Sequence, residues 1–132
     1  MQAITPYPLA LVVADYVHRD PSTGKMTIIG TFSMIGGAEF PLVHPVMAVY
    51  AALTDGRGKM KVKLELIDVD EEREPIFSQE VEADFVDPRM ILEINFHATN
   101  LQFVHSGEYR LQLSANEEFL VERRIIVLEN DK

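Results

Sequence analysis

The stretch Lys59-Met60-Lys61-Val62-Lys63-Leu64-Glu65-Leu66 decides the fold class of this chain. Apolar and charged side chains alternate along it, and a period of two places them on opposite faces of a β-strand. A helix would instead bring residues three and four apart onto one face, which this pattern does not allow. The stretch therefore predicts a strand with one face in a core and the other in water.

A second alternating run, residues 77–85, follows after a turn at residues 70–75. If opposite residues have numbers that add up to 145, Lys63 faces Glu82 while Val62 faces Ala83. Such a register satisfies charge on one face and packing on the other, as cross-strand pairs require. We therefore expect the two runs to form an antiparallel hairpin.

The same period recurs along the rest of the chain, with Gly, Pro, Asn or Asp between the runs. Eight strands are expected, at about residues 9–18, 26–35, 46–53, 60–66, 77–85, 90–96, 109–113 and 119–128. The segment ending in Gly107-Glu108-Tyr109 resembles the corner before a late strand of immunoglobulin and fibronectin type III domains, where a tyrosine hydroxyl bonds to upstream backbone. We predict an all-β, antiparallel immunoglobulin/fibronectin-like sandwich of about seven to eight strands with Greek-key features, a single domain over residues 1–132.

Composition restricts the function classes. The 132 residues are 47% hydrophobic and 25% charged, which is typical of a globular domain, and there is no cysteine to form disulfides or thiolate sites. A net charge of −9 without a basic patch argues against nucleic-acid binding. The apolar segment at residues 8–17 lacks a basic start and is interrupted by Asp15, so we expect no signal peptide, no membrane span and a cytoplasmic location.

Three histidines are the candidate metal ligands: His44, His97 and His105. Alternate loops of an antiparallel sandwich share one end, and this places the connections that carry the three imidazoles together. Zinc is bound by histidine nitrogen at about 2 Å, so convergence of these rings would make a metal site. The alternative is that each imidazole is solvated in its own loop, because no spacing such as His-Glu-x-x-His ties them together.

The acidic segment 68–74 invites a calcium interpretation, since several carboxylate oxygens suit that ion. A C2-like site would need aspartates from a second loop, and the available Asp20 and Asp55 are expected at the opposite end of the sandwich. Glu80, Glu82 and Asp84 point outward in parallel along one strand and so are expected to protect a solvent face. Both groups are interpreted as solvated surface.

No residue carries the signature of a catalytic group. The serines lie in no Gly-x-Ser-x-Gly context, and Gly36-Gly37 lacks the strand–loop–helix setting of a phosphate-binding loop. The interpretation therefore includes no catalytic residue and no cofactor. An enzyme is not the favoured class.

Four motifs together resemble a family of short, uncharacterised bacterial β-sandwich proteins, a domain of unknown function. They are Leu11-Val12-Val13-Ala14-Asp15-Tyr16-Val17, Lys25-Met26-Thr27-Ile28-Ile29-Gly30-Thr31-Phe32, Phe40-Pro41 followed by His44-Pro45, and Gly107-Glu108-Tyr109-Arg110-Leu111. The resemblance implies a bacterial β-sandwich and supplies no site residues.

The expected function is a non-catalytic binding or accessory module that acts through protein–protein contacts. The strands expected at 26–35 and 46–53 are apolar on both faces, and such strands are either central or covered by another subunit. We therefore expect a homodimer and a protein partner of unknown identity. The alternative function is a metal-binding protein or metal-dependent enzyme that uses the histidine-rich loop end.

Overall fold

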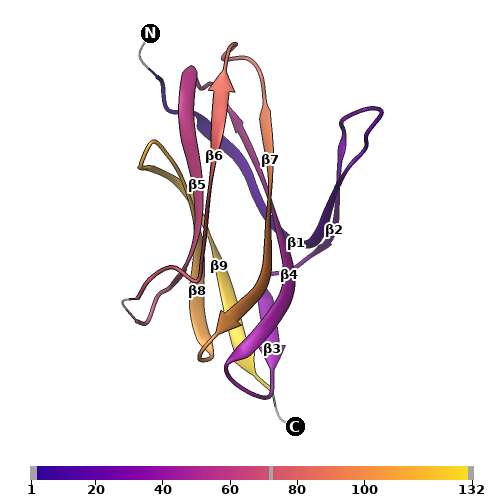
Figure 1. Ribbon diagram of the computed structural model, residues 1–132, viewed down its shortest axis with the longest axis vertical. Coiled ribbons are helices and arrows are strands. Elements are labelled where there is room, and N and C mark those ends of the chain that lie inside the picture. The colour runs from indigo at the N-terminus through magenta and orange to yellow at the C-terminus, as the bar shows by residue number, and fades with distance from the viewer. Residues whose placement is uncertain (1–2, 72, 131–132) are drawn as a thin grey trace.

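The computed structural model describes residues 3–71 and 73–130, and this part of the chain is built from strands and loops (Figure 1). Nine strands follow one another along it: β1 (Tyr7–Arg19), β2 (Met26–Thr31), β3 (Met34–Gly37), β4 (Leu42–Thr54), β5 (Gly58–Asp68), β6 (Phe77–Phe85), β7 (Leu92–Phe103), β8 (Gly107–Ala115) and β9 (Glu118–Glu129). The prediction of an all-β chain is confirmed. Within the described residues there is no helix of the length and apolarity that a membrane crossing requires.

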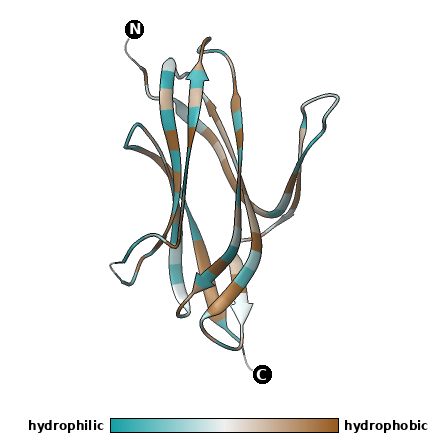
Figure 2. Ribbon diagram, in the orientation of Figure 1, coloured by the Kyte–Doolittle hydropathy of each residue, from teal (hydrophilic) through white to brown (hydrophobic). Residues whose placement is uncertain are grey.

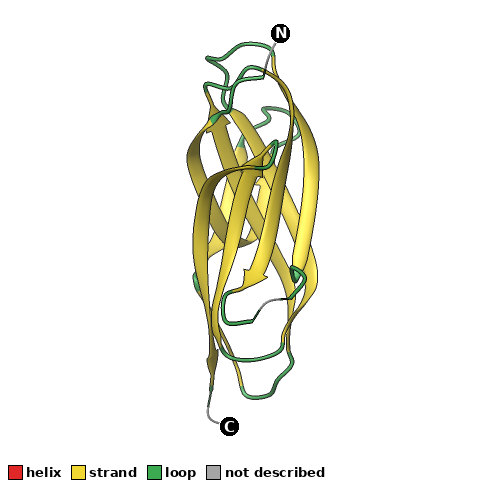
Figure 3. Cartoon of the chain, turned by 90° about the vertical axis from the view of Figure 1, so that its left-hand side faces the viewer, coloured by secondary structure: helices red, strands yellow, loops and turns green. Residues whose placement is uncertain are grey.

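The strands form two sheets that pack face to face (Figure 3). The first sheet has the order β2-β1-β4-β7 and the second the order β3-β9-β8-β5-β6. Strands that are distant in the sequence lie side by side in both, β4 with β7 and β5 with β8. The β1–β2 hairpin projects from the side of this sandwich (Figure 1).

The single strand expected at residues 26–35 is two strands in different sheets. The backbone N–H of Phe32 donates to Val13 in the first sheet, and the carbonyl of Ser33 accepts from Ile126 in the second. The chain therefore crosses between the sheets at these two residues. Because β3 then runs parallel to β9, the second sheet is mixed and the expectation of purely antiparallel pairing is wrong there.

The β5–β6 hairpin forms with a register two residues away from the expected one. Lys61 lies opposite Glu82 and Lys63 opposite Glu80, while Val62 lies opposite Val81. The turn is closed by a bond from the Ile76 N–H to the Leu66 carbonyl, and turn length sets register. A shift of two keeps every side chain on its expected face, as the alternating bands along β5 show (Figure 2).

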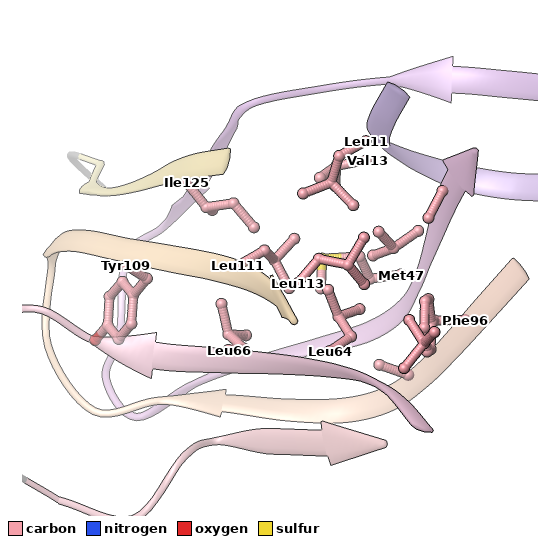
Figure 4. Packing of buried hydrophobic residues seen from close by; sticks show 14 of the residues in the cluster. Leu11, Val13, Met47, Leu64, Leu66, Phe96, Tyr109, Leu111, Leu113 and Ile125 are labelled. Carbon is pink, nitrogen blue, oxygen red and sulfur yellow. The ribbon is translucent and has the colours of Figure 1, made fainter. Parts of the chain in front are cut away.

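The core between the sheets ends at a tyrosine corner. The Tyr109 side chain is fully buried and lies at one end of the apolar cluster (Figure 4). Its hydroxyl donates to the His105 carbonyl at 2.6 Å, and its ring contacts Phe103 edge-on with centroids 4.9 Å apart. The prediction that Tyr109 bonds back to upstream backbone is confirmed.

The connection expected around residues 97–107 is largely strand. β7 continues to Phe103, because Asn100 takes a positive φ of 53° and lets the strand bend and continue. Before the bend the buried side chains are Phe96 and Ala98, and after it they are Leu101 and Phe103. The change from even to odd positions is what an irregularity in a strand produces.

Candidate functional site

A buried carboxylate marks the end of the sandwich that holds the tyrosine corner. Asp68 is the last residue of β5 and falls on the inward side of its alternation, where Met60, Val62, Leu64 and Leu66 pack in the core. A buried charge requires compensating partners. The side chain of Asp68 has no exposed surface; it accepts hydrogen bonds from His105 Nε2 at 2.8 Å and from the Asp70 N–H at 3.0 Å, and it forms an ion pair with Arg73 Nε at 3.2 Å.

Both ring nitrogens of His105 lie next to hydrogen-bond acceptors. Nδ1 lies 2.7 Å from the Ser106 carbonyl and Nε2 bonds the Asp68 carboxylate. The bond to the Ser106 carbonyl, followed by the bond to Asp68, raises the pKa of His105. Both acceptors favour the imidazolium form, so this corner contains a histidine–aspartate ion pair when the ring is protonated.

Gly107 allows the loop to close over this cluster. Its φ is +142°, and a Cβ at this position would lie 2.8 Å from an Asp70 carboxylate oxygen. Only glycine takes such a backbone conformation at low cost. The cluster therefore depends on a glycine directly before the tyrosine-corner strand.

The same corner contains a group of potential metal ligands. Asp68, Glu71 and His105 each offer one donor atom, and these atoms lie within 4.8 Å of one another. The Arg73 guanidinium, however, pairs with both Asp68 and Glu71. The carboxylates of Asp68 and Glu71 can thus bind a positively charged group. Within the chain that group is the Arg73 guanidinium, joined by His105 when its ring is protonated.

The other two histidines predicted as ligands lie in different surroundings. His44 lies on β4 against the ring of Phe32, with centroids 5.5 Å apart, and its Nε2 is buried without a hydrogen-bond partner among the described residues. His97 lies within β7, opposite Ala48 and exposed. Among the described residues the group of close donors contains His105 and neither of the other two. The structure joins His105 to the acidic turn instead.

The interpretation of segment 68–74 as solvated surface is wrong for Asp68, which is buried, and the sequence did not predict its pairing with His105 and Arg73. The available signal was the parity of Asp68, which continues the apolar side of the alternation at 60, 62, 64 and 66. A charged residue at a core position predicts a buried, partnered group.

The aspartates considered for a calcium site have local roles. Asp20 Oδ1 accepts from the backbone of Ser22 and Thr23, and these bonds, those to Ser22 first, lower the pKa of Asp20. Asp55 occupies a turn with φ of 64°. Both carboxylates therefore belong to tight turns between strands.

The outer face of the second sheet is charged. Bonds join its side chains across strands, as between Arg110 and Glu122 at 3.1 Å and between Arg124 and Glu108 at 3.4 Å. We call this surface the charged face. Ile67 and Ile126 also face outward on it, and its charged outward residues are Lys59, Lys61, Lys63, Glu65, Glu80, Glu82, Asp84, Glu108, Arg110, Glu122 and Arg124. The expectation that Glu80, Glu82 and Asp84 line a solvent face is confirmed, because all three are exposed.

The outer face of the first sheet is almost free of charge. Its central outward residues are Ala10, Val12, Ala14, Val46, Ala48, Tyr50 and Ala52, and we call them the apolar face. Beside them on β7, Glu93 is the charged outward residue, and it accepts a bond from the Tyr50 hydroxyl. Burial, followed by that bond, raises the pKa of Tyr50 to about 12.

Comparison with known proteins gives a family and a weak structural likeness. The sequence model of the Family of unknown function (DUF6941) matches residues 9–128. No curated protein matches the chain in sequence. Two crystal structures of a β-glucosidase from Listeria innocua, in complex with glucose and with isofagomine, are similar at 16% and 13% identity, each with a TM-score of 0.47. The matches cover 76% and 96% of this chain but 15% and 17% of the enzyme chains.

Proposed function

Since the chain belongs to this family of unknown function, its own residues must supply the argument, and we propose that it is a non-catalytic binding module that self-associates through the sheet β2-β1-β4-β7. The proposal includes a homodimer and a further protein partner. It includes no catalytic residue, cofactor or nucleic acid, and the cytoplasmic location remains part of it.

The contrast between the two outer faces is the observation that carries the proposal. The charged face carries ion pairs within β8 and between β8 and β9, and charged side chains of this kind keep a sheet surface solvated. Among the described residues, the apolar face has no such ion pairs on β1 and β4; Val46 is exposed there, Ala10, Val12 and Tyr50 are half-buried, and Ala14, Ala48 and Ala52 are buried. Depletion of charged residues is typical of the centre of a protein–protein contact.

The net charge of the chain favours the sheet β2-β1-β4-β7 as the place where a second copy of the chain binds. Each copy has a net charge of −9, so two copies repel one another wherever acidic surfaces approach. The first sheet offers an approach that buries few ionised groups, and such groups are costly to bury unpaired. A two-fold dimer needs a surface that is complementary to itself, and an uncharged surface meets this condition more easily than an acidic one.

The immunoglobulin/fibronectin-like type of the sandwich is also part of the proposal. The tyrosine corner at Tyr109 and the pairing of β4 with β7 and of β5 with β8 support it. Domains of this type commonly display binding surfaces on a rigid frame.

Sedimentation velocity over a micromolar concentration series tests the proposal. A self-associating chain gives a mass that rises toward twice 14.9 kDa as concentration increases. A mass that stays at 14.9 kDa throughout the series would remove self-association from the proposal. Adding salt serves as a control, because contacts between uncharged surfaces persist where ionic ones weaken.

The arrangement of Asp68, Glu71 and His105 favours a second candidate function, metal binding. One nitrogen and two carboxylate ligands suit zinc, with a water or another group in the fourth position. A metal would have to displace the Arg73 guanidinium from Asp68.

A thermal-shift titration with zinc separates this candidate from the first. If the site binds, zinc raises the Tm of the wild type and not that of His105→Gln. The matched variant His97→Gln keeps the shift, because His97 lies outside the group. An unchanged wild-type Tm at a large excess of zinc eliminates the candidate.

A further inference from the structure

The two sheets have four edge strands, and β7 is the least protected of them. β2 and β3 are short, with 6 and 4 residues, and β6 carries Glu80, Glu82 and Asp84 beside its edge. β7 is 12 residues long, has no proline or lysine, and pairs only with β4 in the sheet order of the described residues. Long edges without such protection are templates for pairing with another strand.

The regular part of this edge lies before the bend at Asn100. Over Leu92–Thr99 the side chains alternate between the core side and the outer side of the sheet. Leu92 and Ile94 are only partly buried where they pack against the core. An added strand would therefore cover apolar surface as well as bond the free backbone groups.

We propose that two copies of this chain pair along their β7 strands, edge to edge and antiparallel, with Asn95 of each copy opposite Asn95 of the other. This inference rests on the proposed self-association through this sheet; it assigns the contact between the two copies to the edge strand β7 and leaves the apolar face to the protein partner. The pairing joins two four-stranded sheets across a two-fold axis.

Side-chain complementarity selects this register. In an antiparallel pair of identical strands, residues that share a face must have numbers with an even sum, because side chains alternate. Centring on Asn95 places Glu93 opposite His97 twice, once on each side of the axis. The imidazole N–H of His97 can donate to the carboxylate of Glu93. This carboxylate already accepts a bond from the Tyr50 hydroxyl and still has lone pairs to accept another.

The inner side of the strand fits the same register. Ile94 lies opposite Phe96, and Leu92 lies opposite Ala98, so apolar residues meet apolar residues next to both cores. A shift by two residues in either direction places Glu93 opposite Asn95 or Thr99 and loses both Glu93–His97 pairs. One register thus satisfies charge on the outer side and packing on the inner side.

Edge pairing also has a consequence for the apolar face. Because the two sheets become continuous, the apolar faces of the two copies lie on one wider sheet surface. The dimer therefore presents the protein partner of the proposed function with two equivalent surfaces, which strengthens binding to a two-fold or repeated target.

Disulfide cross-linking tests the register directly, since the native chain has no cysteine. In Asn95→Cys the two thiols face each other across the axis, where Cα atoms of opposite residues are about 4.5 to 5.5 Å apart, within disulfide range. In the matched variant Thr99→Cys the two residues are roughly 27 Å apart along the strands. Both positions are exposed in the monomer, so both variants are expected to fold.

Under mild oxidation Asn95→Cys is expected to become a covalent dimer, while Thr99→Cys stays largely uncross-linked on non-reducing gels. Equal cross-linking of both variants would overturn the register. If the wild type sediments as a dimer and Asn95→Cys does not cross-link, the edge inference fails while the proposed function stands. If the wild type is a monomer throughout, both fail.

Charge variants at His97 provide a second measurement that leaves the fold intact. His97→Lys keeps an attraction to Glu93 at both pairs, and His97→Glu replaces it by repulsion. Because the sign of two symmetric cross-strand pairs is reversed between these variants, their dissociation constants should differ by roughly tenfold or more. Equal dissociation constants would contradict the Glu93–His97 pairing.

Discussion

Replacing Tyr109 by phenylalanine removes one hydroxyl group from the end of the core and leaves the ring in place. That hydroxyl donates to the His105 carbonyl at 2.6 Å from a side chain with no exposed surface. The variant thus loses a hydrogen bond and leaves a carbonyl without this donor. Loss of one partner of a buried bond costs about 1 to 3 kcal/mol.

The melting temperature converts this cost into a measured shift. A domain of 132 residues has an unfolding entropy of about 0.28 kcal/mol/K, so the variant should melt about 4 to 11 °C below the wild type. The chain has no tryptophan, and far-ultraviolet circular dichroism is therefore the suitable signal. Protein concentration must be equal in all samples, because association raises the apparent stability.

Tyr7→Phe is the matched control. Tyr7 is 62% exposed, so removal of its hydroxyl should change the free energy of unfolding by no more than about 0.5 kcal/mol. If Tyr109→Phe melted within the same narrow range as Tyr7→Phe, the tyrosine corner would not stabilise this sandwich, and the reasoning would be refuted.

Three further perturbations follow from the same core and corner. The raised pKa of His105 means that its contribution to stability is fully present below about pH 6.5 and is lost as pH rises through the folded-state pKa. In urea titrations, the difference in unfolding free energy between wild type and His105→Gln should therefore shrink over that pH rise. A difference that does not change with pH would contradict this expectation. Gly107→Ala forces a Cβ to within 2.8 Å of Asp70 at a φ of +142° and should cost about 1 to 3 kcal/mol, read from the urea midpoint. Leu64→Ala opens a cavity at a fully buried position and should cost about 2 to 5 kcal/mol in the same assay, whereas a cost below 1 kcal/mol would mean that the core relaxes around it.

Period-two alternation was sufficient to predict an all-β chain, because most of its strands have one face in the core. The same pattern could not predict the crossing at Phe32 and Ser33, since residues on both sides of it are extended and apolar. Nor could it predict the β5–β6 register, because a shift of two residues preserves every face. The turn between β5 and β6 sets that register through the bond from the Ile76 N–H to the Leu66 carbonyl, and the alternation of the sequence does not reveal this bond.

The candidate site was predictable only in part. Tyr109 could be assigned from its local motif, because a tyrosine corner spans few residues. The predicted grouping of the three histidines did not identify the site, because His97 was expected in a connection and lies within strand β7. The burial of Asp68 could be predicted because it continues the apolar positions 60, 62, 64 and 66 of the alternation. Its partners His105 and Arg73 could not be predicted in this way, since they come from two different loops.

Hydrogen exchange over a concentration series tests the central claim, self-association through the sheet β2-β1-β4-β7, most directly. On association, amide exchange should slow in β7 and, more weakly, in β4, while β8 and β5 of the second sheet keep their rates. The free backbone groups of β7 are the ones that gain partners, so its peptides should show the largest change. Protection that appears in β8 or β6 instead, with β7 unchanged, would contradict the account.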